Sequence, residues 1–159
     1  GERVDDDTCP QPSDAQGQVL LNMETLWQQA YPSECVIVRP TGIYGTSVSR
    51  MIKLAETTKS YPKLHWSNRI HIDDLVAFLA HLLHVEHTEK SYICSNSQPL
   101  PLHEIIQWFQ QQLGFPTLVL ESDVSSGKQI HATRMQQMNF ELQHPHCFDD
   151  YLVLLEKRE

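Results

Sequence analysis

The chain has 159 residues, which is enough to bury a sizeable core in one domain or to form one part of a larger two-lobed protein. Its net charge of −8 at pH 7 argues against a general nucleic-acid binder, which needs a basic face to neutralise phosphates. The sequence shows neither a signal peptide nor an apolar segment long enough to span a membrane. We therefore expect a soluble, cytoplasmic protein that binds no nucleic acid and no membrane.

The N-terminal part of the chain predicts a loop followed by a helix. Residues 1–12 are acidic and polar, and we expect them to form an exposed loop. Ser13 or Asp14 is a suitable N-cap for a helix that continues to about Ala30. An apolar stripe at helical spacing supports this helix and consists of Val19, Leu20, Met23, Leu26 and Trp27.

The next stretch joins a strand to a glycine-containing loop. The β-branched run after Cys35, up to Val38, is typical of a parallel strand that is buried on both faces. Pro40 is expected to end this strand, because proline has no N–H for a ladder hydrogen bond. Gly42 and Gly45 predict a turning loop beyond the strand's carboxyl end, where open α/β sheets bind their ligands.

The remaining sequence predicts short helices alternating with short strands. Helices are expected over residues 47–58, from Asp73 or Asp74 to about 84, from Pro101 to a C-terminal Gly114, over 132–138 before Asn139, and around 148–155. Strands are expected over 91–94 and 117–120, and loops over 59–70 and 122–128. A strand that is buried in a parallel sheet needs neighbouring strands, and the chain offers only these short candidates. The sheet therefore looks incomplete.

A local basic cluster interrupts the acidic chain. Between residues 50 and 69, five basic side chains stand against the single acid Glu56, and they are Arg50, Lys53, Lys59, Lys63 and Arg69. Such a cluster can attract a phosphorylated small molecule. The alternative interpretation is a solvated surface with chance clustering.

The cysteines and histidines indicate neither a disulfide framework nor a metal site. The four cysteines form no CxxC pair, and Cys35 and Cys94 lie in apolar runs that suit small core residues in a reducing compartment. His81, His84 and His87 step around a helix instead of sharing one face, and no carboxylate or thiolate completes a metal set. We therefore expect no metal.

The segment from Asn68 to Asp74 combines polar residues, alternating apolar positions and a helix start. Arg69 is the better ligand candidate, because its planar fork suits phosphate or carboxylate. His71 can orient through a hydrogen bond to an aspartate or to the backbone. In the alternative interpretation, His71 and the aspartates only fix the turn into the helix.

These motifs together resemble a known family. Residues 39–45 (RPTGIYG), followed by residues 69–74 (RIHIDD), are similar to the C-terminal half of the NAD-dependent epimerase/dehydratase family, the extended short-chain dehydrogenases that act on nucleotide sugars. The resemblance covers nearly the whole chain and is closest to the atypical branch. It implies an α/β fold: the last units of a Rossmann-like parallel sheet, plus a small, mostly helical α+β lobe that binds the substrate, with the N-terminal Rossmann half absent.

The resemblance also implies how the chain is divided and what it binds. Residues 1–45 would close the dinucleotide-binding domain, and residues 46–159 would mainly form the substrate lobe, with the helix near 73–84 returning to the Rossmann part. NAD or NADP would bind beside Arg39, Pro40, Thr41, Gly42 and Tyr44. A nucleotide sugar or other phosphorylated ligand would contact Arg50, Lys53, Asn68, Arg69 and His71. The missing N-terminal half would be a partner, and a homodimer stays open.

Two departures from the family pattern leave the activity open. The phosphate-binding GxxGxxG loop is absent, and so are the groups that choose NAD over NADP. Counting back from Glu24, the positions of the family's catalytic Tyr and Lys hold Gln16 and Leu20, so we assign no catalytic residue. The chain is then part of an oxidoreductase with altered or lost Tyr/Lys catalysis. The alternatives are a non-catalytic dinucleotide-binding sensor or a protein-interaction module.

Overall fold

The computed structural model describes residues 1–157. In chain order its strands are β1 (Glu2–Val4), β2 (Ile37–Pro40), β3 (Gly42–Tyr44), β4 (Ser60–Tyr61), β5 (Leu64–Ser67), β6 (Arg69–His71), β7 (Ser91–Cys94), β8 (Leu100–Pro101), β9 (Val119–Leu120) and β10 (Ser125–Ile130). The helices are α1 (Ala15–Ala30), α2 (Ser49–Thr57), α3 (Ile72–Leu82), α4 (Leu102–Leu113), α5 (Thr133–Gln137) and α6 (Cys147–Glu156). Within this part of the chain, no helix combines the length and apolarity needed to cross a membrane.

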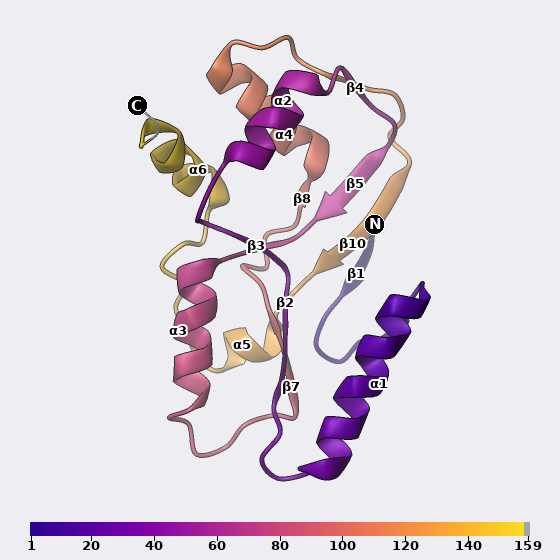
Figure 1. Cartoon of the computed structure of the whole chain (residues 1–159), viewed down its shortest axis with the longest axis vertical. Helices are drawn as coiled ribbons and strands as arrows, with labels where there is room; N and C mark the ends of the chain where they lie inside the picture. Colours follow the sequence, from indigo (N-terminus) through magenta and orange to yellow (C-terminus); the bar gives the residue numbers. More distant parts are fainter. Residues whose placement is uncertain (158–159) are drawn as a thin grey trace.

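The lower half of the molecule in Figure 1 is built on the parallel pair of β2 and β7, with α1 and α3 on either side. A core cluster holds this half together and contains Ile70, Leu75, Phe78, Tyr92, Cys94, Ala132 and Met135. Among residues 1–157, β2 pairs only with β7. The sequence predicts a strand that is buried on both faces; this is wrong for residues 1–157, because Ile37 and Val38 are only half-buried and the neighbouring α1 itself buries no residue.

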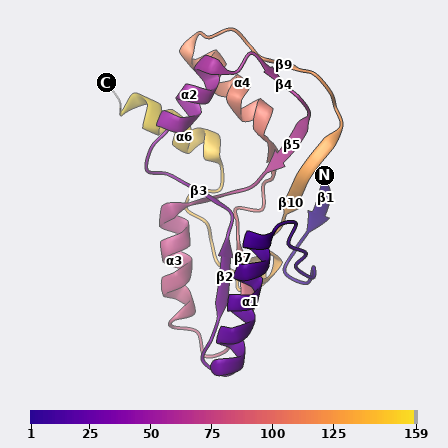
Figure 2. The same cartoon turned by 45° about the vertical axis from the view of Figure 1, so that its right-hand side comes forward.

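Helices α2, α4 and α6 gather in the upper half (Figures 1 and 2). Their core contains Tyr44, Val48, Ala55, Ile105, Ile106, Phe109, Leu118, Cys147 and Tyr151. The buried Gln110 ties this half together: its amide donates to the carbonyls of Ala55 and Thr58 and accepts the N–H of Leu118. The expected helices over 47–58, 101–114 and 148–155 are confirmed to within a few residues.

A four-stranded sheet in the order β1-β10-β5-β8 joins the chain's first residues to its later part. The expected loops over 1–12 and 122–128 are therefore wrong in part, since β1 and β10 form parallel pairs that polar local sequence does not signal. Asp6 fixes the end of this N-terminal segment, because its carboxylate accepts the N–H groups of Ile93 and Arg134 and the hydroxyl of Thr133.

Helix α1 forms where the sequence predicts it, with the side chain of Asp14 accepting the N–H of Gly17 as an N-cap. Its apolar stripe has no partner in this part of the chain: Val19, Leu20, Met23, Leu26 and Trp27 are 49–63% exposed. The helix is held instead through Glu24, whose carboxylate accepts two hydrogen bonds from Nε of Arg39 on β2, at 3.0 and 3.1 Å.

The segment from Gly42 to His71 contains more strand than the sequence predicts. Gly42 lies in β3, which pairs with β6, so the loop expected there begins only at Gly45, whose φ of +114° confirms the turn. The expected loop over 59–70 is wrong, because β4, β5 and β6 form within it. These strands are two to four residues long, so each depends on a partner that is distant in sequence.

Several helix ends differ from expectation in detail. The N-cap of α3 is His71, not Asp73 or Asp74, since its Nδ1 accepts the N–H of Asp73 at 3.2 Å. Pro101 is likewise the N-cap of α4 and not its first residue. Gly114 and Asn139 adopt positive φ as predicted. The apolar residues of the expected helix that ends near 84 are not all buried, because Val76, Leu79 and Leu83 are exposed.

Candidate functional site

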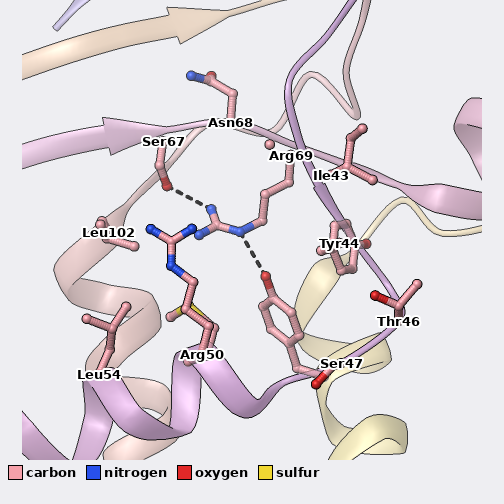
Figure 3. A pocket seen from close by; sticks show the side chains of 13 residues that line it. Ile43, Tyr44, Thr46, Ser47, Arg50, Leu54, Ser67, Asn68, Arg69 and Leu102 are labelled. Carbon is pink, nitrogen blue, oxygen red and sulfur yellow. Dashed lines mark hydrogen bonds between the residues drawn. The ribbon is translucent and has the colours of Figure 1, made fainter.

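A cavity of about 290 Å³ lies between the two halves of the chain. It is formed by β3 and the loop after it, the start of α2, the junction of β5 with β6, the first residue of α4, and α6 (Figure 3). Its polar lining residues are Tyr44, Thr46, Ser47, Arg50, Ser67, Asn68, Arg69 and Tyr151, and its apolar wall includes Ile43, Met51, Leu54 and Leu102.

Arg69 is the buried positive charge of this cavity. Its Nε donates to the hydroxyl of Tyr151 at 2.8 Å and its Nη1 donates to Oγ of Ser67 at 2.7 Å. Only 9% of the residue is exposed, and no carboxylate among residues 1–157 lies within ion-pair distance of it. A buried charge without a counter-charge is costly, so the cavity favours an anionic ligand.

Arg50 supplies a second positive charge to the same cavity. It lies in the first turn of α2 and lines the same cavity as Arg69 (Figure 3). Within the described residues it also forms no ion pair. Two guanidinium groups that face one cavity repel one another, and a doubly charged group such as a phosphate in that cavity offsets this repulsion.

The structure separates the predicted substrate residues into two groups. Arg50, Asn68 and Arg69 line the cavity, whereas Lys53 is exposed on α2 and does not line it. His71 lies behind the cavity and not in its lining, where its ring packs edge-on against that of Tyr44, with 5.1 Å between the ring centres. The basic cluster is thus divided, because Lys59 and Lys63 are also exposed.

The predicted cofactor residues lie mostly around a second cavity of about 260 Å³. Arg39, Pro40, Thr41 and Gly42 line it, together with Val4, Asn68, Ile93 and Ile130. Gly42 and Asn68 belong to the linings of both cavities, so the two cavities adjoin. Tyr44 faces only the first cavity, and Arg39 is already paired with Glu24.

We call the cavity that Arg50 and Arg69 line the arginine cavity. Next to it, four polar side chains form a connected group: Tyr44, Asp150, His144 and His71. The hydroxyl of Tyr44 donates to Oδ2 of Asp150 at 2.6 Å, and Nδ1 of His144 lies 2.6 Å from Oδ1 of the same carboxylate. The ring of His144 stacks on that of His71, with 3.6 Å between the ring centres and 15° between the planes. Loop, strand and helix are joined here by side chains that are far apart in sequence.

Burial shifts the pKa values of two of these side chains, His71 and Tyr44. Burial lowers the pKa of His71, and the nearby His144 lowers it further, although Asp150, Asp73 and Asp74 oppose the shift. Burial also raises the pKa of Tyr44 above its usual range, helped by its hydrogen bond to Asp150. A neutral phenol that donates to a carboxylate is a structural group and not a proton acceptor at neutral pH.

His71, Asp73 and His144 bring potential metal-ligand atoms within 4.8 Å of one another. Their arrangement does not suit a metal ion. Stacked imidazole planes direct their nitrogen lone pairs side by side, so an ion in the plane of one ring lies well out of the plane of the other. The Nδ1 atoms are also engaged, with the N–H of Asp73 in His71 and with Asp150 in His144.

Sequence reasoning missed Tyr151, His144 and Asp150 at this site. Tyr151 comes 82 residues after Arg69, and Asp150 comes 106 residues after Tyr44. Asp149 and Asp150 read as ordinary acids in the first turn of the last helix, and the His144-Pro145-His146 run carries no spacing that is typical of a site. No local signal in the sequence identifies them.

Comparison with solved structures shows how this arrangement relates to known proteins. No protein-family model matches the sequence, and no curated protein matches it. A protein from Methylobacillus flagellatus whose name places it among the NAD-dependent epimerases/dehydratases is 34% identical, with a TM-score of 0.86, over 99% of this chain and 59% of its own.

Two more distant structures share the fold. The dTDP-glucose 4,6-dehydratase from Bacillus anthracis, solved in complex with NAD, has a TM-score of 0.75 and 15% identity over 100% of this chain and 57% of its own. The UDP-N-acetylglucosamine 4-epimerase from Bacillus cereus has a TM-score of 0.71 and 12% identity over 96% and 60%. The chain thus spans about 60% of the length of these structures. By its likeness to the Methylobacillus protein, the chain belongs to the NAD-dependent epimerase/dehydratase family.

Proposed function

We propose that the chain forms the substrate-binding part of an NAD(P)-binding oxidoreductase that acts by hydride transfer on a nucleotide sugar or a similar carbonyl substrate. The observation that carries the proposal is the pair of arginines, Arg50 and Arg69, which face one cavity without a carboxylate partner among residues 1–157. The two more distant structures, from Bacillus anthracis and Bacillus cereus, act on nucleotide sugars according to their names, which supports the same substrate class here.

The proposed substrate lies with its phosphates between the two guanidinium groups. The hydrogen bonds to Tyr151 and Ser67 hold the guanidinium of Arg69 in one orientation, which lowers the entropy cost of binding. The apolar wall of Met51, Leu54 and Leu102 then contacts the uncharged part of the ligand.

The adjoining cavity is the proposed place for the reactive end of the cofactor. Apolar side chains from three strands line it, Val4, Ile93 and Ile130, which suits a flat, weakly polar ring. NAD or NADP would supply the hydride chemistry when bound, and Gly42 and Asn68, which line both cavities, would border both the cofactor and the substrate. The phosphate-binding part of the cofactor site, in this proposal, belongs to the N-terminal half that the chain lacks.

This proposal keeps the division of the chain that the resemblance implies. Residues 1–45 end the dinucleotide-binding domain, and residues 46–159 mainly form the substrate lobe, with α3 returning to the Rossmann part. The exposed apolar stripe of α1 and the unpaired edge of β2 support it, because a missing neighbour would cover both. A homodimer is compatible with these surfaces.

A second candidate function is a non-catalytic sensor of the dinucleotide. It is favoured by Gln16 and Leu20, which occupy the positions where the family carries its Tyr and Lys. Both side chains are exposed in the first half of α1, and neither can exchange a proton with a substrate at neutral pH.

Binding of UDP to the intact protein tests the arginine cavity. Arg50→Gln is expected to weaken UDP binding by roughly five- to thirtyfold in calorimetry, since one charge-assisted contact is worth about 1–2 kcal/mol. Lys53→Gln is the matched control, because it removes the same charge one turn along α2 outside the cavity. Equal affinities of the two variants overturn the anion site.

Turnover separates the enzyme from the sensor. The intact protein is incubated with NAD or NADP and a panel of nucleotide sugars, conversion of the sugar is followed by chromatography, and net reduction of the cofactor is followed by its absorbance. Turnover with any member supports the oxidoreductase. Quenching of protein fluorescence by NADH or NADPH without any turnover supports the sensor.

A further inference from the structure

The arginine cavity is closed on one side by α6, which packs into the upper core through Cys147 and Tyr151 and also makes polar contacts at two neighbouring residues. Tyr151 accepts the hydrogen bond of Arg69, and Asp150 binds Tyr44 and His144. The residues that lead into the helix are anchored as well, since the N–H groups of Gln143 and His144 donate to the buried carboxylate of Asp74. The position of α6 therefore depends on the segment 143–146.

That segment is fastened to the body of the protein by the stacked rings of His71 and His144. His71 belongs to the rigid side of the contact, because it ends β6 and caps α3. His144 belongs to the other side, in the connection between α5 and α6. The ring-to-ring distance of 3.6 Å leaves no room for water between them.

The hydrogen bond by which His71 caps α3 defines the protonation state of His71 that fits the folded structure. Nδ1 of His71 accepts the N–H of Asp73, so this nitrogen carries no proton in the closed structure. A proton on Nδ1 turns the acceptor into a donor that faces another donor, and the N-terminus of α3 loses its cap. His144 differs, because its Nδ1 donates to Asp150 in either of its charge states.

The charges around His71 and His144 influence whether His71 takes a proton. Asp73, Asp74 and Asp150 favour a proton on His71, whereas burial and the adjacent His144 disfavour it; Tyr44, on β3, faces it as a neutral phenol. The carboxylates are used elsewhere: Asp150 holds Tyr44 and His144, and Asp74 holds two backbone N–H groups. Asp73 is largely exposed, so water screens its charge.

We propose that the stacked His71 and His144 rings form a proton-operated latch, which fastens α6 over the arginine cavity while His71 is neutral and releases it when His71 takes a proton. Release withdraws Tyr151 from Arg69 and leaves the guanidinium with its hydrogen bond to Ser67 alone, so that its orientation is less fixed. The affinity of the cavity for a phosphate-bearing ligand then falls as the pH falls through the slightly acidic range. Only this last consequence rests on the proposed function of the cavity.

Hydrogen exchange of α6 in the intact protein tests the latch without any ligand. Exchange of the peptide that covers residues 147–156 is followed by mass spectrometry between about pH 8 and pH 5, and each rate is corrected for the chemical exchange rate at that pH. The expected result is corrected exchange that becomes roughly three- to tenfold faster at the acidic end. A pH-independent corrected rate in the wild-type protein overturns the proposal.

The variant His71→Asn identifies the responsible group. Asparagine keeps an oxygen that accepts the N–H of Asp73, and so preserves the cap, but it does not titrate in this range. The pH-dependent step is expected to disappear in this variant. His131→Asn is the matched control, since burial also lowers the pKa of His131, which faces Arg3 and Asp5 and not α6. A step that persists in His71→Asn, or that disappears in His131→Asn, contradicts the latch.

Sulfate separates a failure of the latch from a failure of the proposed function. Sulfate keeps its double charge throughout the range, so any change in its binding comes from the protein. Weaker sulfate binding at acidic pH in the wild type, and pH-independent binding in His71→Asn, support the coupling of α6 to the cavity. If α6 loosens as expected while sulfate binds at no pH, the latch stands and the anion site is wrong.

Discussion

Tyr151 on α6 accepts a 2.8 Å hydrogen bond from Nε of Arg69 on β6, and this bond joins the last helix of the chain to its most buried arginine. Burial raises the pKa of this tyrosine, so the hydroxyl is neutral at physiological pH and acts only as a dipole toward the guanidinium. The arginine keeps its full charge toward the cavity and gains an orientation.

Removal of that hydroxyl is expected to destabilise the protein. Tyr151→Phe keeps the ring packed against Phe109 but leaves a charged donor without its partner, at a cost of about 1–3 kcal/mol in the free energy of unfolding. Urea denaturation followed by circular dichroism measures it. Tyr31→Phe is the control, because Tyr31 is exposed on the end of α1; a loss of equal size there would show that the bond to Arg69 contributes nothing.

Gly45 is expected to tolerate no side chain. Its φ is +114°, and a Cβ at this position would collide with the imidazole of His71. Gly45→Ala therefore adds a steric clash to backbone strain and should cost more than about 2 kcal/mol. Gly114→Ala carries the strain alone, since its φ is +71° and nothing lies within 4 Å of the added carbon. Similar thermal midpoints for the two variants would contradict the close packing of His71 on Gly45.

Gln110 is expected to be the most sensitive polar residue of the upper core. Gln110→Met keeps the side-chain length but leaves the carbonyls of Ala55 and Thr58 and the N–H of Leu118 without their partner. The expected loss is about 3 kcal/mol or more in chemical denaturation. Gln111→Met, on the exposed side of the same helix, should change stability by less than about 0.5 kcal/mol.

Alkaline pH is expected to destabilise the fold. Burial raises the pKa of Cys147 to about 11 and that of Cys94 to about 12, and it raises the pKa values of Tyr44 and Tyr151 as well. The unfolded chain releases these protons at the ordinary pKa values, near 9 for cysteine and 10 for tyrosine, whereas the folded chain retains them. Stability is therefore complete below about pH 9 and falls as the pH rises from there toward 12.

The unfolding free energy, measured by urea titration at several pH values, tests this sign. Phenolate absorbance gives an independent check, because Tyr44 and Tyr151 should ionise only together with loss of helical circular dichroism. A stability that rises between about pH 9 and pH 11 would contradict the burial of these four groups.

Local chemistry explains which parts of the fold the sequence predicts. Helix α1 with its cap at Asp14, the left-handed Gly114 and Asn139, and the turn at Gly45 follow from preferences that act within a few residues. The short strands β1, β4 and β6 and the six-residue β10 do not. Each of them exists because a distant partner completes its hydrogen bonds, and polar sequences such as Ser125–Ile130 carry no sign of that partner.

For the candidate site, too, the sequence predicts only the residues that belong to a local pattern. The basic cluster over residues 50–69 predicts Arg50, and the segment from Asn68 to Asp74 predicts Asn68 and Arg69; the structure brings all three to one cavity. Lys53 shares their charge, but it lies one turn further along α2 and is exposed outside the cavity lining. Tyr151, His144 and Asp150 reach the site through tertiary folding alone, so charge counting does not find them.

The unpaired edge of β2 and the exposed stripe of α1 have a consequence for the chain as it is made in the cell or in the laboratory. Together they present open backbone hydrogen-bonding groups beside apolar side chains, a combination that recruits further copies and promotes aggregation. Until some neighbour covers these surfaces, the solubility of the chain and its dependence on chaperones are set by them and not by the arginine cavity.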